Sequence, residues 1–216
     1  MSTITLGSNT YTLVTLPANP GFVDLTLTMD DTVAVVQSPF VPSQVQTQAW
    51  PGADGWKLQG TLPKMPNSVS GPWIGFLAAL RGRANVFQAG DPTRTTPLGK
   101  AQGAPVVNGT ISGGNAVSAY ALNTRGWHAS VYRQLLPGDY LQIVNRLYIA
   151  VAEVDSDGSG NAVIQIWPSL RETPADGAAI KLINPVGVFR LAGNSRPYHR
   201  TVDGLVQVSL QATEAR

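Results

Sequence analysis

The stretch from Pro137 to Glu172 alternates apolar and polar residues in short runs that are separated by turn signals. This period of two predicts β-strands, because successive side chains of a strand point to opposite faces of the sheet. The polar loop DSDGSGN joins two of the runs and is typical of a hairpin connection, and the run YLQI predicts a third strand. The residues predicted to share one face are Leu147, Ile149 and Val151 in one strand, and Ile164 and Ile166 in the next.

The same period recurs along most of the chain. Segments 25–29, 56–62 and 206–212 each have one apolar and one polar face, which is the pattern of half-exposed antiparallel strands. Shorter strands are predicted over three further segments, residues 11–16, 32–36 and 45–50. The sequence therefore predicts a mainly β protein, built from antiparallel β-sandwich or barrel modules.

One segment departs from this period, because its apolar residues recur at the spacing of a helix. These residues are Trp73, Phe76, Leu77 and Leu80, and they predict one short α-helix over about residues 70–81. Its predicted boundaries are Ser70 or Gly71 at the start, Pro72 in the first turn and Gly82 after the last turn. A helix this short is unstable alone, so its apolar face is expected to pack on the N-terminal sheet.

The chain carries little charge, since 13% of its residues are charged against about 25% in an average soluble domain. Two interpretations remain open. Hydroxyl and amide side chains solvate the surface, or neighbouring subunits bury part of it, and we favour the second. The chain has no cysteine, which excludes disulfides, thiolate catalysis and metal sites with sulfur ligands.

The net charge of +2 comes from basic residues that are spread along the chain. No basic cluster with interleaved aromatic residues is present, so nucleic acid is not expected to be the primary ligand. No leader pattern and no run of roughly 18 apolar residues is found. The chain is therefore expected to be made in the cytoplasm and not to insert into a membrane.

The segment from Gly90 to Gly126 is rich in Gly, Pro, Thr and Asn, which predicts either a long surface excursion or a linker. The apolar runs at 106–107 and 120–122 indicate that part of it forms short strands. Deletion of residues 95–118 is expected to leave the fold intact, because the free energy of loop closure changes slowly with length.

A soft domain boundary is placed near Gly103. Residues 1–103 would then form an N-terminal β domain with the helix. Residues 104–216 would hold the loop-rich segment, the hairpin module and the closing strand. A single domain remains the alternative.

The turn from Asp155 to Gly160 resembles the start of a calcium loop of the EF-hand type, with oxygen donors at its first, third and fifth positions. The twelfth position should be a bidentate Glu, and here it is Ile166. The flanking residues also predict strands, so a hairpin turn is the favoured interpretation. Weak cation binding by the turn is left open.

Catalytic candidates are few, and we expect no enzyme activity, no metal site and no cofactor. The chain has no Gly-x-Ser-x-Gly motif, and its histidines, His128 and His199, lie in loop-like sequence. A glycosidase would need two carboxylates about 5 to 9 Å apart across a cleft. The glutamates that could supply them are Glu153, Glu172 and Glu214.

Aromatic residues could line a carbohydrate-binding face, and the chain has five tryptophans, Trp50, Trp56, Trp73, Trp127 and Trp167. Four of them fall in strand or helix patterns, where core packing is the ordinary role. Trp127 is the one in loop-like sequence, so its exposure beside other rings would indicate an adhesin. The sequon at residues 108–110 matches a glycosylation site by form only.

Three segments carry a resemblance to a known family: VVQSPF…SQVQTQAWPGADGWKLQGTLPKM, WIGFLAALRGRANVFQAGDPTRTTPLG and LLPGDYLQIVNRLYIAVAEVDSDGSGNAVIQIWPSLRETPADGAAIKLINPVGVFRLA. In this order they resemble minor tail or tail-tip proteins of long-tailed bacteriophages, of the distal-tail type. The resemblance extends from about Val35 to Ala192. It implies a β-sandwich or barrel subunit of the virion, which forms a ring at the end of the tail tube.

The resemblance implies several partners: further copies of the chain in a ring, the tail tube protein, the tail hub and other tail-tip proteins. It implies synthesis in the host cytoplasm and a final location at the tail tip or baseplate. We expect the segment from Gly90 to Gly126 to act as a contact arm within such an assembly. The alternatives are a carbohydrate-binding adhesin or a receptor-binding tail module.

Overall fold

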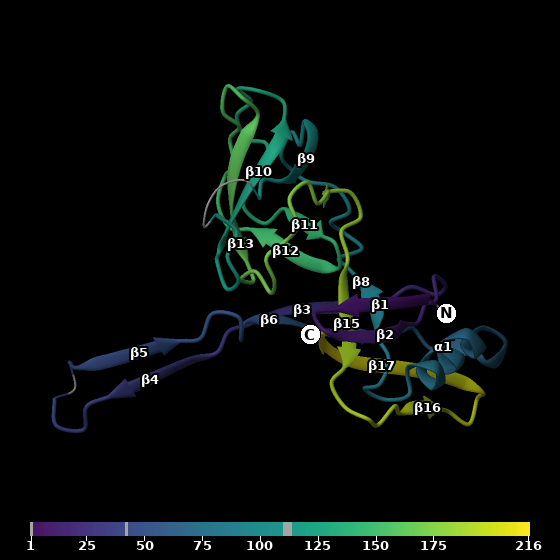
Figure 1. The fold of residues 1–216 in the computed structure, drawn as a ribbon. Helices are drawn as coiled ribbons and strands as arrows, with labels where there is room; N and C mark the ends of the chain where they lie inside the picture. Colours follow the sequence, from purple (N-terminus) through teal and green to yellow (C-terminus); the bar gives the residue numbers. More distant parts are fainter. Residues whose placement is uncertain (1, 42, 110–113) are drawn as a thin grey trace.

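The computed structural model describes residues 2–41, 43–109 and 114–216 (Figure 1). Over these ranges the chain is mainly β, with one helix, two larger antiparallel sheets and two separate hairpins. The predicted fold class is therefore confirmed. No helix in these ranges is long and apolar enough to cross a membrane.

A seven-stranded sheet forms the lower body in Figure 1. In spatial order its main strands are β3 (Asp24–Asp30), β6 (Gly55–Thr61), β17 (Leu205–Glu214), β15 (Gly187–Leu191) and β8 (Phe87–Ala89). The short strands β7 (Met65–Pro66) and β16 (Tyr198–Arg200) also pair with β17. The apolar faces predicted for segments 56–62 and 206–212 are buried here, whereas Met29 at the end of β3 is 51% exposed.

Helix α1 (Asn67–Leu80) packs its apolar side into the core of this sheet. The four predicted contact residues Trp73, Phe76, Leu77 and Leu80 are all buried, which confirms the predicted face. The predicted start was wrong, since the helix begins at residue 67, directly after β7, and Pro72 lies inside it. Ser70 is not a cap, because it lies within the helix and its hydroxyl donates to the Asn67 carbonyl at 3.2 Å. At the other end Arg81 and Gly82 both have positive φ, so the helix stops where predicted.

A six-stranded sheet forms the upper part of the molecule in Figure 1. Its spatial order is β14 (Ile180–Lys181), β11 (Tyr140–Ile143), β12 (Arg146–Ala150), β13 (Asn161–Trp167), β10 (Ala121–Trp127) and β9 (Gly103–Val107). The two end strands approach each other, and a single bridge between Val106 and Ala179 makes the sheet a nearly closed barrel. Its interior is filled by residues such as Leu122, Leu141 and Ile164.

The predicted strands of the hairpin module are confirmed as β11, β12 and β13. β12 does not have one buried and one exposed face, because both of its faces are covered. Leu147 packs into the core of the seven-stranded sheet, while Tyr148 and Ala150 pack into the core of the barrel. Val151, predicted to share a face with Leu147 and Ile149, follows the strand and is 57% exposed. β12 lies between two cores, so both of its faces are covered.

The segment from Gly90 to Gly126 is not a continuous loop, although most of its described residues lie outside strands. It supplies β9 and β10, which confirms the predicted short strands, and Val107 is fully buried. Deletion of residues 95–118 would remove β9 together with this core residue, so the structure gives reason to expect that the deletion disturbs the fold. Part of the segment, and Thr110 of the sequon, lie outside the described residues.

The chain leaves the seven-stranded sheet after β8, builds the six-stranded sheet, and returns at β15. The closing strand β17 therefore pairs with β6 and β15, not with the hairpin module. The division into residues 1–103 and 104–216 stays a prediction.

Two hairpins complete the fold. β1 (Ser2–Leu6) and β2 (Asn9–Leu13) pack on the body through Ile4 and Leu6, which contact a small core with Val86 and Val188. Among the described residues, β4 (Val33–Gln37) and β5 (Val45–Ala49) pair only with each other, and they extend away from the body (Figure 1).

Candidate functional site

The β4–β5 hairpin is the most unusual surface feature of the molecule. It continues the ribbon formed by β3 and β6, after a break in which residues 31–32 on one side face residues 50–54 on the other. We call residues 32–50 the arm. Not one residue between Thr32 and Trp50 is charged, although an average segment of this length carries about four or five charges.

The strand register gives the arm two different faces, because residues directly opposite each other project to the same side. One side, the apolar face, carries Val33, Val35, Gln37, Val45, Thr47 and Ala49. The other side, the amide face, carries Ala34, Val36, Gln46 and Gln48. Val35 and Val36 are 64% and 63% exposed, so neither face is covered by the rest of the chain.

The tip of the arm is held by Ser38. Its hydroxyl accepts hydrogen bonds from the backbone N–H of Phe40 at 3.3 Å and of Val41 at 3.2 Å. Its backbone N–H donates to the carbonyl of Gln44 at 3.0 Å. Phe40 projects from this turn and is 91% exposed, which places a large aromatic side chain at the far end of the arm.

The root of the arm is tied to the end of β13. The indole N–H of Trp167 donates to the carboxylate of Asp31 at 2.9 Å. On the opposite strand, the backbone N–H of Gly52 donates to Ser169 Oγ at 2.8 Å and to Asp54 Oδ1 at 3.0 Å. The two segments that lead into and out of the arm therefore contact the same short segment at the end of β13.

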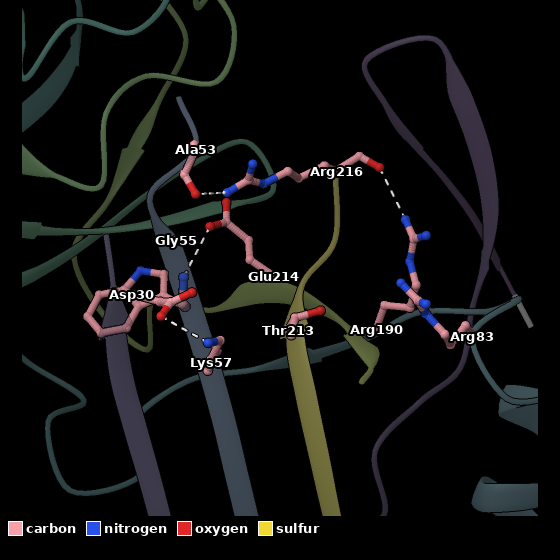
Figure 2. A pocket seen from close by; sticks show the side chains of 10 residues that line it. Asp30, Ala53, Gly55, Lys57, Arg83, Arg190, Thr213, Glu214 and Arg216 are labelled. Atoms are coloured by element: carbon pink, nitrogen blue, oxygen red, sulfur yellow. Dashed lines mark hydrogen bonds and ion pairs between the residues drawn. The ribbon is translucent and has the colours of Figure 1, made fainter. Parts of the chain in front are cut away.

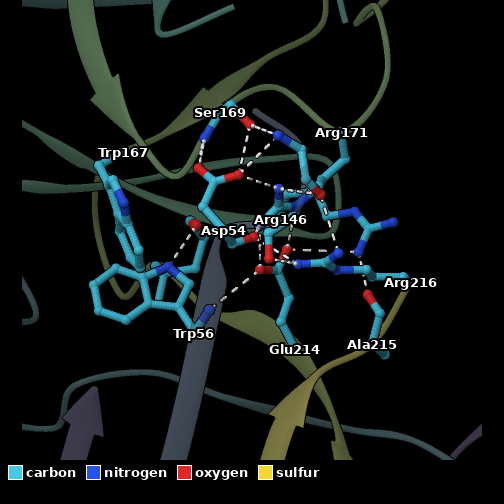
Figure 3. Close-up of polar contacts among 12 residues, drawn as sticks. Asp54, Trp56, Arg146, Trp167, Ser169, Arg171, Glu214, Ala215 and Arg216 are labelled. Atoms are coloured by element: carbon cyan, nitrogen blue, oxygen red, sulfur yellow. Dashed lines mark hydrogen bonds and ion pairs between the residues drawn. The ribbon is translucent and has the colours of Figure 1, made fainter. Parts of the chain in front are cut away.

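A buried ionic cluster lies beneath this root (Figure 3). Arg171 places Nη1 3.0 Å from Asp54 Oδ1 and Nη2 3.0 Å from Glu214 Oε2, and all three side chains are at most 5% exposed. Ser169 donates to the Asp54 carboxylate from its backbone N–H at 2.6 Å and from its hydroxyl at 2.8 Å. We call Asp54, Arg171 and Glu214 the anchor.

Two further arginines extend the anchor. Arg216 donates to the carbonyls of Gly52, Ala53 and Asp54 at 3.0, 2.9 and 2.6 Å, and these residues turn the chain from β5 into β6. Arg146 donates to the Ala215 carbonyl and lies 3.7 Å from Glu214. Within the described ranges, Arg146 Nε is the one buried side-chain nitrogen or oxygen without a hydrogen-bond partner. Arg216 thus holds the backbone that leads from the arm into β6, whereas Arg146 contacts the end of β17.

Asp54 and Arg171 of the anchor are both ionised at neutral pH. Burial on its own would raise the pKa of Asp54, but hydrogen bonds from Ser169 and Arg171 outweigh burial, and the pKa of this carboxyl is lowered. Burial also opposes the charge of Arg171, yet Glu214 and Asp54 raise the pKa of this guanidinium. Nearby, burial and the charge of Glu214 raise the pKa of Tyr148 to about 12.

A pocket of about 280 Å³ opens beside the anchor (Figure 2). Asp30 and Lys57 form an ion pair at 2.9 Å on one side of it. On the other side Arg190 donates to the Arg216 carbonyl at 3.2 Å. Glu214, the second carboxylate of the lining, is already paired with Arg171. The pocket therefore presents paired charges, not two carboxylates available for acid and base chemistry.

The turn from Asp155 to Gly160 is held by hydrogen bonds of its own. The Asp157 carboxylate accepts from the backbone N–H of Ser159 and of Asn161, each at 2.8 Å, and these bonds lower the pKa of Asp157. This geometry is that of a hairpin turn, which supports the favoured interpretation. Among the described residues, no three His, Cys, Asp or Glu side chains gather as metal ligands would.

The other candidates from the sequence are not brought together. His128 and His199 are both exposed, and they lie at the end of β10 and in β16, on different sheets. Glu153 is exposed and paired with Arg133, and Glu172 is exposed, whereas Glu214 is buried in the anchor. The glutamates therefore do not form a pair across a cleft.

Trp127, the tryptophan in loop-like sequence, is only 5% exposed, and its indole donates to Thr124 Oγ1 at 2.8 Å. Of the five tryptophans, Trp50 at the root of the arm is the one that is exposed, at 46%. Sequence analysis missed the arm as a site, although the absence of charge from Thr32 to Trp50 could have revealed it.

No protein-family model matches this chain, and no curated protein is found to be similar to it.

Proposed function

We propose that this chain is a structural subunit of the tail tip or baseplate of a long-tailed bacteriophage, of the distal-tail type. In this role a ring of copies links the tail tube to the tail hub and to the receptor-binding parts. The sequence resemblance between Val35 and Ala192 suggests this class. The observation that carries the proposal is the arm, which is uncharged, exposed on both faces and fixed at its root.

The arm is suited to assembly because it lacks a core of its own. A two-stranded hairpin is marginally stable in water unless a further layer covers one of its faces. Exposed valines beside a large exposed aromatic residue are typical of surfaces that other proteins cover. The anchor restricts the direction of the arm before any contact forms, which lowers the conformational entropy lost on docking.

The carbohydrate-binding alternative is less well supported. It requires Trp127 to be exposed beside other rings, and this side chain is buried in the barrel. A hydrolase is less well supported too, since the described glutamates and histidines lie apart and the carboxylates of the pocket at the anchor are paired with cations.

The proposal is tested in the phage that encodes the chain. A stop codon in its gene should give particles without functional tails, and the wild-type gene supplied in trans should restore infectious particles. Mass spectrometry of purified virions should find the chain, and a tagged copy should localise to the tip of the tail by electron microscopy. Complete infectious particles without the chain, or virions that lack it, would overturn the proposal.

A further inference from the structure

The pocket in Figure 2 has a polar floor that is set by strand register. Arg190 of β15 lies directly opposite Thr213 of β17, and Thr213 lies directly opposite Lys57 of β6. Directly opposite residues of antiparallel strands project to the same face, with Cβ atoms about 5 Å apart. The three side chains therefore form a row across three neighbouring strands, and all three line the pocket (Figure 2).

The guanidinium group of Arg190 is held in place from outside this row. Its Nη2 donates to the Tyr11 hydroxyl at 3.1 Å and to the Arg216 carbonyl at 3.2 Å. Its Cζ also lies 5.0 Å from the centre of the Tyr11 ring. A guanidinium has five N–H donors, and those on Nε and Nη1 make no hydrogen bond to the described residues. Arg190 is thus fixed in position and keeps donors for a ligand.

A second guanidinium group reaches the pocket from the loop after α1. Arg83 follows Gly82, where a Cβ would lie 2.9 Å from Asn194 Oδ1, and its own backbone N–H donates to that oxygen at 3.3 Å. The close approach of Asn194 therefore requires glycine and fixes the backbone of Arg83. Figure 2 shows Arg83 and Arg190 on the same side of the pocket, and both line it.

Positive side chains outnumber negative ones around the pocket, since its lining holds four cations and two carboxylates. Asp30 is paired with Lys57, and Glu214 is paired with Arg171, which lies outside the lining. Within the described part of the chain, no ion pair to an acidic side chain includes the other cations of the lining, Arg83, Arg190 and Arg216. The pocket therefore has an excess of positive charge.

This excess of charge and the type of donor indicate the chemical class of the ligand. The planar fork of a guanidinium group matches the oxygens of a phosphate or a carboxylate. Two surplus positive charges are complementary to a phosphate monoester, which carries about −1.5 to −2 at pH 7, more than to a carboxylate with a single charge. The volume of about 280 Å³ is close to the lower limit of roughly 300 Å³ for small-molecule sites, so the ligand is small.

We propose that this pocket binds a dianionic phosphate group, either as inorganic phosphate or as the monoester of a small molecule. Arg83 and Arg190 donate to the phosphate oxygens, and the Thr213 hydroxyl donates from the floor between Arg190 and Lys57. The lining comes from β3, β6, β15, β17 and the loop after α1, so a bound phosphate also joins these elements. The site lies outside the arm, and the proposal does not depend on an assembly role.

Three phosphate probes test the class of ligand and its source. At about pH 8 a phosphate monoester, whose second pKa is about 6, is a dianion. We expect inorganic phosphate or methyl phosphate to bind saturably in an NMR titration at constant ionic strength, with amide shifts centred on Arg190 and Thr213. Tighter binding of methyl phosphate would identify an ester as the ligand, and tighter binding of inorganic phosphate would identify the free ion.

Dimethyl phosphate is the matched control among the probes, because it keeps the phosphate group but carries one negative charge. It should bind at least about 10-fold more weakly, which corresponds to the loss of one charge-assisted contact. Equal affinity for dimethyl phosphate, or shifts that do not saturate for any of the three probes, would overturn the proposal.

The chain supplies a matched pair of variants. Arg83→Gln removes an exposed guanidinium group that makes no ion pair with a described residue, and phosphate should then bind about 10-fold more weakly. Lys64→Gln removes the same charge from an exposed residue outside the lining and should bind phosphate like wild type. Equal affinities of the two variants would show that the pocket is not the site.

Arg190→Lys separates charge from geometry, because it keeps the positive charge and loses the guanidinium fork. It should also weaken phosphate binding about 10-fold. Since this variant disturbs the contact with Tyr11, thermal unfolding without phosphate checks its fold. The Arg83→Gln variant leaves that contact intact and still decides the proposal if Arg190→Lys unfolds. None of these outcomes bears on whether the chain is found in virions, so the proposed function is tested separately.

Discussion

Arg171 Nη1 lies 3.0 Å from Asp54 Oδ1, and both side chains are almost completely buried between the two sheets at the root of the arm. The residues are far apart in the chain and come from a segment after β13 and from the turn before β6. This pair therefore does two things at once. It joins the two sheets, and it fixes the backbone from which the arm projects.

The first prediction concerns this pair. Asp54→Asn should lower the free energy of unfolding by about 3 to 5 kcal/mol, because it leaves the buried charge of Arg171 without one of its partners. The exposed pair of Asp30 and Lys57 provides the control, and Asp30→Asn should cost less than about 1 kcal/mol. Urea denaturation measures both. Equal effects of the two substitutions would show that the buried pair does not hold the sheets together.

The second prediction is a pH dependence. The folded pKa of Asp54 lies below its unfolded value of about 3.9, so its contribution is fully present above that value. The contribution is lost as the pH falls through the lowered folded pKa. Stability should therefore change little from this source between pH 5 and 7 and fall below about pH 4. Asp54→Asn should lose less stability over the acid range than wild type, and parallel acid titration curves would contradict this assignment.

The third prediction tests the helix. Leu77 is 4% exposed and packs into the core of the seven-stranded sheet, so Leu77→Ala should cost about 2 to 5 kcal/mol through lost burial and a remaining cavity. Val69 lies on the same helix but is 39% exposed, and Val69→Ala should be nearly neutral. Chemical denaturation distinguishes the two. A neutral Leu77→Ala would mean that the helix does not depend on this face.

The fourth prediction compares two deletions. Replacing residues 33–49 with a short Gly/Ser linker should leave the body folded, because none of the described residues of the arm belongs to any of the three cores. Replacing residues 95–118 in the same way should destabilise the barrel, because β9 and the buried Val107 are lost. Thermal unfolding and near-UV circular dichroism report the outcome. A well-folded second deletion would contradict the barrel topology.

Much of the fold follows from patterns that are local in the sequence. The alternation in segments 56–62 and 206–212 predicts β6 and β17 together with their buried faces, and the helical spacing from Trp73 to Leu80 predicts the buried face of α1. The alternation does not predict the burial of β12, because that strand lies between two cores and has no solvent-exposed face. It also fails to show that β4 and β5, which have good strand patterns, meet no third layer.

The sequence by itself determined the mainly β class, the positions of most strands, the one helix and the absence of charge over the arm. These are local properties, because strand and helix periods depend on neighbouring side chains. Only the tertiary structure decided that Asp54, Arg171 and Glu214 form one buried anchor and that the chain returns to its first sheet at β15. Such contacts depend on where distant strand ends meet, which is set by the packing of the two sheets and leaves no periodic signal along the chain.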